Sequence, residues 1–387
     1  MTAAGQKQRI QKKRKLLRGG FDLPLFVLVM IILMLGLIMM FSASYADGYY
    51  NHHGDGFFYI KRQGLWAALG LVVMYIVAQM DYHWLRKFVL PVMGITYLLL
   101  VVVLFTHPIN GVRRWIDAGP INIQPSEIAK FAVVLIFAHL IAKYSTKREN
   151  KMQTFKYGVA PFILILATIA GLMIKEPHLS GTILILSIGC TMMFVGGTRV
   201  RWFVIGISMA GGALLGMVLF TKIIVYAKNR LVYWIDPFKD PQHHGWQTIQ
   251  SLYAIGSGGI MGLGLGNSRQ KYLYVSEPQN DFVFPILCEE LGLVGAVIVI
   301  VLFALLVWRG YVVAMRAPDR FGALMAVGLT TQVGLQAILN IAVTTNTIPN
   351  TGISLPFFSY GGSSLLMLLF QMGIILSISR FSSIEQT

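Results

Sequence analysis

The stretch "NDFVFPILCEELGLVGAVIVIVLFALLVW", residues 280–308, joins an acidic segment to a long apolar run. From Phe282 onward, the run exceeds the about 20 residues that a helix needs to cross a bilayer core. The chain contains only 16 Asp and Glu, yet four of them fall within 14 residues here: Glu277, Asp281, Glu289 and Glu290. The stretch therefore predicts a membrane-spanning helix with carboxylates near one end, and a chain so poor in acid needs a reason to place them there.

Similar apolar runs recur along the chain and indicate its fold class. Of the 387 residues, 56% are hydrophobic and 12% are charged, whereas a soluble domain carries about 25% charged residues. Hydropathy places spans at about 22–44, 60–79, 86–105, 126–143, 158–174, 180–197, 202–222, 282–308, 321–343 and 363–380. We therefore expect an all-α, polytopic integral membrane protein with ten transmembrane helices.

The distribution of basic residues predicts the orientation of these helices. Seven Lys and Arg precede the first span, and such residues accumulate in cytoplasmic loops, where they contact anionic lipid headgroups. With the N-terminus inside, the cytoplasmic segments hold 20 of the 32 Lys and Arg. This topology explains the net charge of +16 better than nucleic-acid binding does. The basic tail could instead dock a cytoplasmic partner.

This orientation divides the chain into one membrane domain and two tails. Because the number of spans is even, both termini are expected in the cytoplasm. We expect a basic N-terminal tail at 1–21, a single membrane domain at 22–380 and a C-terminal tail at 381–387. The long extracytoplasmic loop at 223–281 joins the seventh and eighth spans, so Asp281 is predicted on the outer face.

Asp281 has two interpretations at this stage. Asn280 or Asp281 could simply cap the following helix, because both residue types accept hydrogen bonds from backbone N–H groups at a helix start. Alternatively, the carboxylate takes part in chemistry at the outer surface. Capping does not explain Glu289 and Glu290, which in a continuous helix would lie two turns deep in the bilayer. We expect at least one of them to face the protein interior.

Other charged residues also gather at predicted outer segments. Glu127 and Lys130 share a helix face, and they could pair in a cavity or let Lys130 extend outward at the interface. Arg113 and Arg114 could clamp a phosphate or contact headgroups. Arg62 lies at the outer end of the second span, against the usual charge distribution, which favours a functional cation.

Two glycine-containing segments lie between predicted spans. "GSGGIMGLGLG", residues 256–266, follows a predicted amphipathic helix at the membrane surface. Its glycines allow close backbone approach, or they form a flexible outer loop. "NTGISLPFFSYGGSS", residues 350–364, contains Gly, Pro and polar residues that predict irregular, non-helical backbone just before the last span. Because irregular backbone at membrane depth must be satisfied by protein or water, we expect it to be buried or to line a cavity.

Several motifs together resemble one family, the SEDS proteins (shape, elongation, division and sporulation), which include FtsW, RodA and SpoVE. The residues of the motifs between 251 and 271 are more similar to those of FtsW and SpoVE than to those of RodA. Two stretches depart from the family pattern: "KEPHLSG" has His178 in place of a carboxylate, and "YVSEPQND" differs at Val275, Ser276 and Asn280. The motifs that carry the resemblance are "KRQ" at 61–63, "RRWI" at 113–116, "QPSEIAK" at 124–130, "QSLYAIGSGG" at 250–259, "GLGNSRQK" at 264–271, "NDFVFPILCEELG" at 280–292 and "SLPFFSYGGSS" at 354–364.

The resemblance implies a peptidoglycan glycosyltransferase of the bacterial cytoplasmic membrane, with its active site on the extracytoplasmic face. Such a protein polymerises lipid II in cell division or sporulation, together with a class B penicillin-binding transpeptidase and other division or sporulation proteins. It also implies Asp281 as the catalytic general base. The implied substrate-binding residues are Arg62, Arg113, Arg114, Glu127, Lys130, Gln250, Ser251, Lys271, Glu277 and Ser359.

No cofactor or protein-bound metal is required by these motifs, although a divalent cation such as Mg²⁺ or Mn²⁺ could assist at a pyrophosphate. Two other functions remain open. A lipid II flippase would need polar groups along the full depth of the membrane, whereas the charged motifs here gather at the outer side. A non-catalytic scaffold would recruit division or sporulation proteins without needing Asp281.

Overall fold

The computed structural model describes residues 20–107, 113–117, 122–146, 149–176, 178–206, 208, 233–242, 245–272 and 274–382. Regular structure in this part of the chain is almost entirely helical. Its α-helices are α2 (Leu23–Asn51), α3 (Phe58–Gln79), α4 (Val89–Val102), α5 (Pro125–Tyr144), α6 (Phe155–Gly158), α7 (Ala160–Lys175), α8 (Leu179–Val195), α11 (Trp246–Ser257), α12 (Val283–Met315), α13 (Arg320–Thr344) and α14 (Gly362–Ser382).

Short elements connect these helices. Two antiparallel pairs of strands each contribute only two residues per strand, so no extended sheet forms in the described residues. The pairs are β1 (Ile116–Asp117) with β2 (Asn122–Ile123), and β3 (Ser145–Thr146) with β4 (Glu149–Asn150). The 3₁₀ helices are η1 (Tyr82–Lys87), η2 (Val103–Phe105), η3 (Lys151–Gln153) and η4 (Pro237–Lys239).

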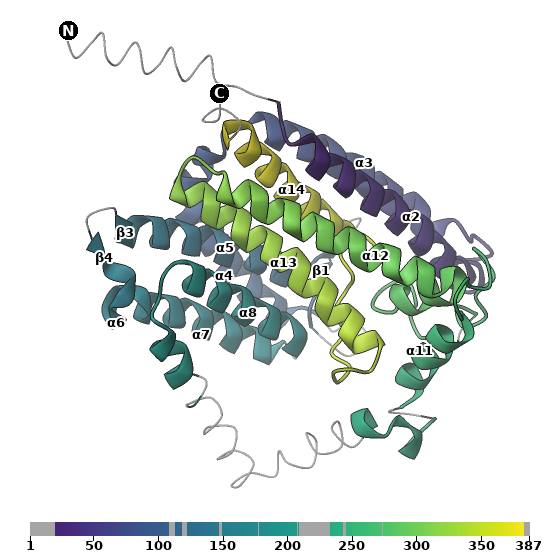
Figure 1. Ribbon diagram of the computed structural model, residues 1–387. Helices are drawn as coiled ribbons and strands as arrows, with labels where there is room; N and C mark the ends of the chain where they lie inside the picture. The colour runs from purple at the N-terminus through teal and green to yellow at the C-terminus, as the bar shows by residue number, and fades with distance from the viewer. Residues whose placement is uncertain are drawn as a thin grey trace.

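The long helices pack side by side in one bundle (Figure 1). Of the helices long enough to span a membrane, α5 and α13 are the most buried. The outer helices instead expose large apolar side chains, including Leu65 on α3 and Leu293 on α12. An apolar exterior suits a bundle whose solvent is lipid, because hydrocarbon does not penalise exposed Leu, Ile and Val side chains.

The all-α, multi-span class predicted from sequence is confirmed. In the described residues, seven helices are long and apolar enough to cross a membrane, and α4 and α8 are shorter apolar helices. Nine of the ten predicted spans coincide with these helices. The other, 202–222, lies mostly outside the described residues, which are helical at 200–206. The count of ten and the orientation therefore stay predictions.

The predicted continuous span at 282–308 is wrong in one respect. Helix α12 is interrupted at Gly292, whose φ of 66° and ψ of −166° are not helical. A positive φ of this kind strongly favours glycine, because it has no Cβ. Residues 283–291 therefore form a separate short helix, and residues 293–315, about 34 Å long, still suffice to cross the bilayer core. Glu289 and Glu290 belong to the short helix and not to the interior of a continuous span.

The glycine-rich segment 256–266 fills this interruption. Where α12 breaks, the backbone groups that lose their helical partners bond to the loop in both directions. Four hydrogen bonds make the exchange: Leu293 N to Gly259 O at 2.9 Å, Val294 N to Ile260 O at 3.2 Å, Leu263 N to Glu289 O at 2.9 Å and Gly264 N to Glu290 O at 3.0 Å. Buried backbone groups need such partners, so the loop and the broken helix form one unit.

Close packing explains why this loop needs glycine. A Cβ on Gly258 would lie 1.9 Å from the carbonyl oxygen of Cys288, and a Cβ on Gly262 would lie 2.2 Å from that of Glu290. Both distances are far below van der Waals contact with rigid backbone. The interpretation of close backbone approach is therefore confirmed, and that of a flexible outer loop is wrong for this segment.

Replacing Gly258 with alanine is expected to destabilise the fold by about 3 kcal/mol, because overpacking against backbone cannot relax cheaply. The measurement is the melting temperature of the purified protein in detergent. Gly256→Ala is the matched control, since it lies two residues away and its Cβ would meet nothing within 4 Å. Equal melting temperatures for the two variants would contradict the packing described here.

Candidate functional site

Asp281 precedes α12 but does not cap it. The N-cap residue of α12 is Phe282, and no side chain makes a capping hydrogen bond there. The Asn280 amide instead donates to Glu277 Oε2 at 2.8 Å. Both capping alternatives raised by the sequence are therefore wrong, and the carboxylate of Asp281 needs another role.

Two buried segments hold Asp281 in place. On α13, the side chain of Asn340 is fully buried and donates to Asp281 O at 2.8 Å and to Ile353 O at 2.6 Å. Gly352, with a φ of 65°, lies so near that a Cβ on it would be 3.0 Å from Asp281 Oδ2. The irregular segment before α14 thus wraps around the carboxylate, and most of its side chains are buried, as expected from sequence.

The surroundings of Asp281 alter its acidity. Burial, followed by the negative charge of Glu277, raises the pKa of the Asp281 carboxyl from 3.8 to about 6, and Arg114 opposes this shift. A carboxylate with such a pKa is ionised at neutral pH but accepts a proton more readily than an exposed one. Glu277 itself is exposed, and its predicted contact with substrate stays a prediction.

Glu127 and Lys130 form a buried ion pair on α5, as their spacing predicted. Lys130 Nζ lies 2.7 Å from Glu127 Oε1, and the two side chains are only 4% and 10% exposed. Lys130 also donates to Gln336 Oε1 on α13 at 2.9 Å, and Gln336 in turn donates to Ser354 Oγ at 3.0 Å. The alternative in which Lys130 extends outward is wrong, because its ammonium group has polar partners inside the bundle.

Arg114 is the arginine that the fold brings to Asp281. Its positive charge acts on Asp281, Glu176 and His178, whose pKa values it lowers. Burial is the larger effect on the latter two: it raises the pKa of Glu176 to about 8 and lowers that of His178 to about 3. By contrast, Arg113 is exposed and donates to Leu104 O at 2.9 Å.

Four residues predicted to bind substrate make contacts within the protein or are buried in it. Ser251 on α11 donates to Thr344 O at 2.7 Å, and Ser359 Oγ accepts from Leu355 N at 2.7 Å. Arg62 is exposed, with its guanidinium carbon 4.2 Å from the centroid of the Phe58 ring. Gln250, beside Ser251, is buried. Substrate contact by these residues stays a prediction.

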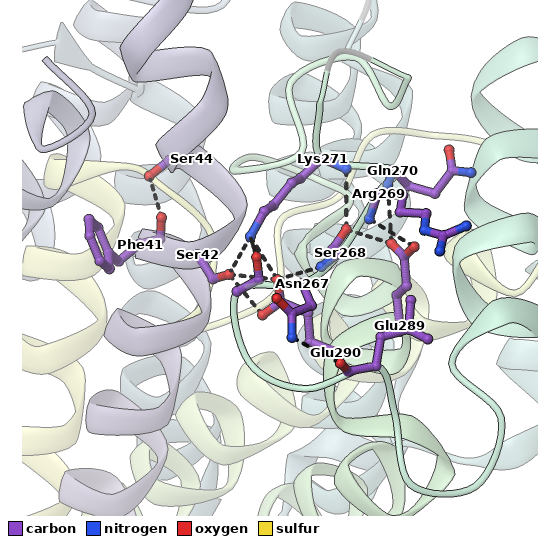
Figure 2. Close-up of polar contacts among 12 residues, drawn as sticks. Phe41, Ser42, Ser44, Asn267, Ser268, Arg269, Gln270, Lys271, Glu289 and Glu290 are labelled. Carbon is purple, nitrogen blue, oxygen red and sulfur yellow. Dashed lines mark hydrogen bonds and ion pairs between the residues drawn. The ribbon is translucent and has the colours of Figure 1, made fainter. Parts of the chain in front are cut away.

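Lys271 lies inside the protein. Its side chain is 3% exposed, and its Nζ lies 3.0 Å from Glu290 Oε1 and 2.7 Å from Gly266 O. Figure 2 shows the ammonium group directed at Glu290 and Ser42. Substrate contact by Lys271 is not tested by this geometry, but its charge already has a partner. The expectation that Glu289 or Glu290 faces the interior is confirmed for both.

Sequence reasoning missed Asn340, Gln336 and Glu176 as neighbours of the site. Asn and Gln within the apolar span 321–343 were a usable signal, because polar residues inside a membrane segment usually face the interior. Glu176 is fully buried, and neither carboxylate oxygen has a hydrogen-bond partner among the described residues. No group of three His, Cys, Asp or Glu that could hold a metal occurs among these residues.

The fold and this site define a class: multi-span helical membrane proteins with a charged, partly buried site at one end of the bundle. The chain belongs to the FtsW/RodA/SpoVE family of cell cycle proteins, whose family model matches residues 23–384. The resemblance inferred from the motifs is thereby confirmed.

Individual relatives match over nearly their whole length. Stage V sporulation protein E of Bacillus subtilis is 39% identical over 364 residues, which cover 93% of this chain and 97% of the relative. A probable peptidoglycan glycosyltransferase FtsW of Geobacter metallireducens is 35% identical over 371 residues, covering 93% and 94%.

Solved structures share the fold. A chain from a study titled "Structural coordination of polymerization and crosslinking by a peptidoglycan synthase complex" superposes with a TM-score of 0.78 at 26% identity, covering 95% of this chain and 99% of that one. The rod shape determining protein RodA of Thermus thermophilus gives a TM-score of 0.67 at 27% identity, covering 94% and 97%.

Proposed function

We propose that this protein is a peptidoglycan glycosyltransferase that polymerises lipid II, with Asp281 as the general base. The observation that carries the proposal is a partly buried carboxylate of raised pKa beside Arg114. Relatives that are 35% identical over nearly the whole chain and are named as probable peptidoglycan glycosyltransferases support the same activity.

In the proposed reaction, Asp281 accepts the proton of the acceptor sugar's 4-hydroxyl as that oxygen attacks the anomeric carbon of the donor. The new glycosidic bond forms while the bond from the anomeric carbon to the pyrophosphate oxygen breaks. The electron pair leaves with the polyprenyl pyrophosphate. One carboxylate suffices for this inverting displacement, because pyrophosphate needs no proton to depart.

Cations near Asp281 would stabilise the charge that develops on the leaving pyrophosphate. Arg114 is the best placed, since its charge already acts on Asp281. Lys130 is less available, because Glu127 neutralises it at 2.7 Å. The described residues offer no ligand cluster for a divalent ion, so no step of the proposed reaction is assigned to a metal.

We place the reaction at the extracytoplasmic face. The beginning of α2 and the far ends of α12 and α14 meet at the opposite end of the bundle, where Arg309 lies 2.7 Å from Asp22 and Asp22 N donates to Ser379. The basic N-terminal tail precedes Asp22 in the sequence, and the charge distribution predicts it to be cytoplasmic. Asp281 would then lie outside, within reach of lipid II headgroups.

We also propose a class B penicillin-binding transpeptidase as partner, in division or sporulation. The solved chain with a TM-score of 0.78 comes from a study of a peptidoglycan synthase complex, which supports a partner of this kind. The sporulation protein E and FtsW relatives support the two cellular settings.

Reconstitution in liposomes separates the proposed polymerase from a flippase. The purified protein, alone and with its transpeptidase partner, is supplied with fluorescent lipid II. Glycan strands are expected, and gel separation of the products measures them. Translocation of lipid II across the bilayer without strands would favour the flippase and overturn the proposal.

Polymerisation is expected to fall as the pH is lowered through about 6, because protonated Asp281 cannot accept a proton. Initial rates at lipid II concentrations well below KM, which report kcat/KM and therefore the free enzyme, measure this acid limb. Removing the neighbouring negative charge with Glu277→Gln should move the limb to lower pH, since that charge raises the pKa of Asp281. A limb that stays in place or moves upward in this variant would contradict Asp281 as its source.

A further inference from the structure

Three segments meet at a buried ion pair at the end of the short helix 283–291 that is remote from Asp281 in sequence. Lys271 from the loop lies 3.0 Å from Glu290 of α12, and both side chains are at most 3% exposed. The hydroxyl of Ser42 on α2 lies 2.7 Å from each Glu290 oxygen and 3.1 Å from Lys271 Nζ. These three residues, which we call the clamp, join α2, the loop and α12 (Figure 2).

Glu289 orders the loop that presents Lys271. Its carboxylate accepts hydrogen bonds from the hydroxyl of Ser268 and from the backbone N–H groups of Arg269, at 3.0 Å, and Gln270, at 3.3 Å. Ser268 Oγ also accepts from Lys271 N at 3.2 Å. Both adjacent glutamates bind this turn, because Glu290 also accepts from Ser268 N at 3.3 Å. Glu290 in addition pairs with the ammonium group of Lys271.

Such a cluster is costly unless it is complete. A buried charge must be paired and hydrogen-bonded, and a hydrophobic replacement of the whole pair is often as stable. Stability alone is therefore no general reason for a buried ion pair at such a position. What the ion pair adds is geometry. Within the loop and α12, Gly266 O and Ser268 N also bond to Lys271 and Glu290, whereas Ser42 is the contact that ties the pair to α2.

The break at Gly292 connects the clamp to Asp281, because the clamp and Asp281 lie at the two ends of the same short helix. Because of the break, no continuous helix joins the short helix 283–291 to the long part of α12, and backbone hydrogen bonds through the loop 256–266 connect the two parts instead. Asp281 lies just before the first residue of that helix, and Glu289 and Glu290 lie in its last turn. At the Asp281 end, Phe282 and Ile286 pack with Ala43 and Val275, while Val283, Phe284 and Leu287 of the short helix belong to the main core. The clamp adds a polar contact at the other end of the same helix.

We propose that the Lys271–Glu290 pair, completed by Ser42, is a positioning element that holds the short helix so that Asp281 faces the substrate from a partly buried setting. This inference rests on the proposed catalytic role of Asp281. Lys271 and Glu290 touch no reacting atom in this account, and they act only through the placement of the short helix.

A positioning role predicts a change that a purely structural role does not. If the clamp loosens, water reaches Asp281, and the burial that raises its pKa is reduced. Glu277 and Arg114 are the charged groups that act on Asp281, and neither belongs to the clamp. The acid limb of the rate should then move to lower pH while the slower chemical step reduces kcat.

The test uses the full-length protein with Lys271→Met and Glu290→Gln combined, so that no unpaired charge is buried. We expect a melting temperature near that of the parent, a KM for lipid II within about twofold and a kcat lowered about tenfold, since small misplacements of catalytic groups are costly. We expect the acid limb to fall by about half a pH unit. Lys271→Arg, which keeps the charge, should recover most of kcat.

The control removes a second ion pair, which joins the start of α2 to α12 at the opposite end of the bundle. Arg309 and Asp22 lie 2.7 Å apart with side chains 20% and 12% exposed. Asp22→Asn combined with Arg309→Met should leave the acid limb in place, whatever it does to the melting temperature.

Full kcat with an unmoved acid limb in the folded double variant would overturn the proposal, as would a lowered kcat with an unmoved acid limb. If the double variant does not fold, Ser42→Ala decides, with a smaller shift of the same sign expected and no shift overturning the proposal. The variant Asp281→Asn tests the proposed function separately. If its activity persists, the catalytic role of Asp281 is overturned, whatever the clamp variants show.

Discussion

Replacing Asp281 with asparagine is expected to reduce glycan-strand formation from lipid II by about a thousandfold. Asparagine has nearly the same shape but cannot accept a proton, and a positioned general base contributes about 10²–10⁴-fold to a rate. The measurement is strand formation by the reconstituted protein together with its transpeptidase partner, so that a partner-dependent activity is not missed.

The fold around this position should survive the substitution. Asn340 holds Asp281 through the backbone carbonyl at 2.8 Å, which asparagine retains. Removing a carboxylate whose pKa is raised by burial also removes a charge that the site disfavours. The melting temperature of Asp281→Asn is therefore expected to equal or exceed that of the parent. A folded variant that still makes strands at the parental rate would rule out the proposed base.

Hydropathy located the described helices well because lipid imposes a simple rule on sequence. A span must be apolar over about 20 residues, and the runs that became α2, α5 and α13 satisfy it. The break at Gly292 escaped this reasoning. A glycine inside an apolar run is compatible with a continuous helix, and the groups that replace the lost hydrogen bonds come from a loop about 30 residues earlier.

The candidate site was predictable in part for a related reason. The i,i+3 spacing of Glu127 and Lys130 determined that they share a face, and the structure pairs them at 2.7 Å. Nothing local in the sequence indicates that Asn340 would bind the carbonyl of Asp281, or that Lys271 would turn inward to Glu290. Those contacts depend on how helices that are distant in the sequence pack together. Local spacing in a single sequence does not indicate that packing.

The same reasoning bears on the pair that the sequence did predict. Glu127→Gln is expected to destabilise the protein by about 3–5 kcal/mol, because it leaves the ammonium group of Lys130 buried without its counter-charge. Lys130 is 3% exposed, and after the substitution its ammonium group would have only neutral amide oxygens as partners, those of Gln336 and of the introduced glutamine. Unfolding of the purified variant in detergent, followed by heat, measures the loss.

A second variant separates the cost of the unpaired charge from the function of the pair. Combining Glu127→Gln with Lys130→Met removes both charges, so most of the lost stability should return, since a buried pair replaced as a whole is often neutral. Polymerisation should not return with it if the Lys130 cation helps to orient the pyrophosphate near Asp281. Recovery of both stability and strand formation in the double variant would limit Glu127 and Lys130 to packing. Recovery of stability alone would assign the pair to the reaction.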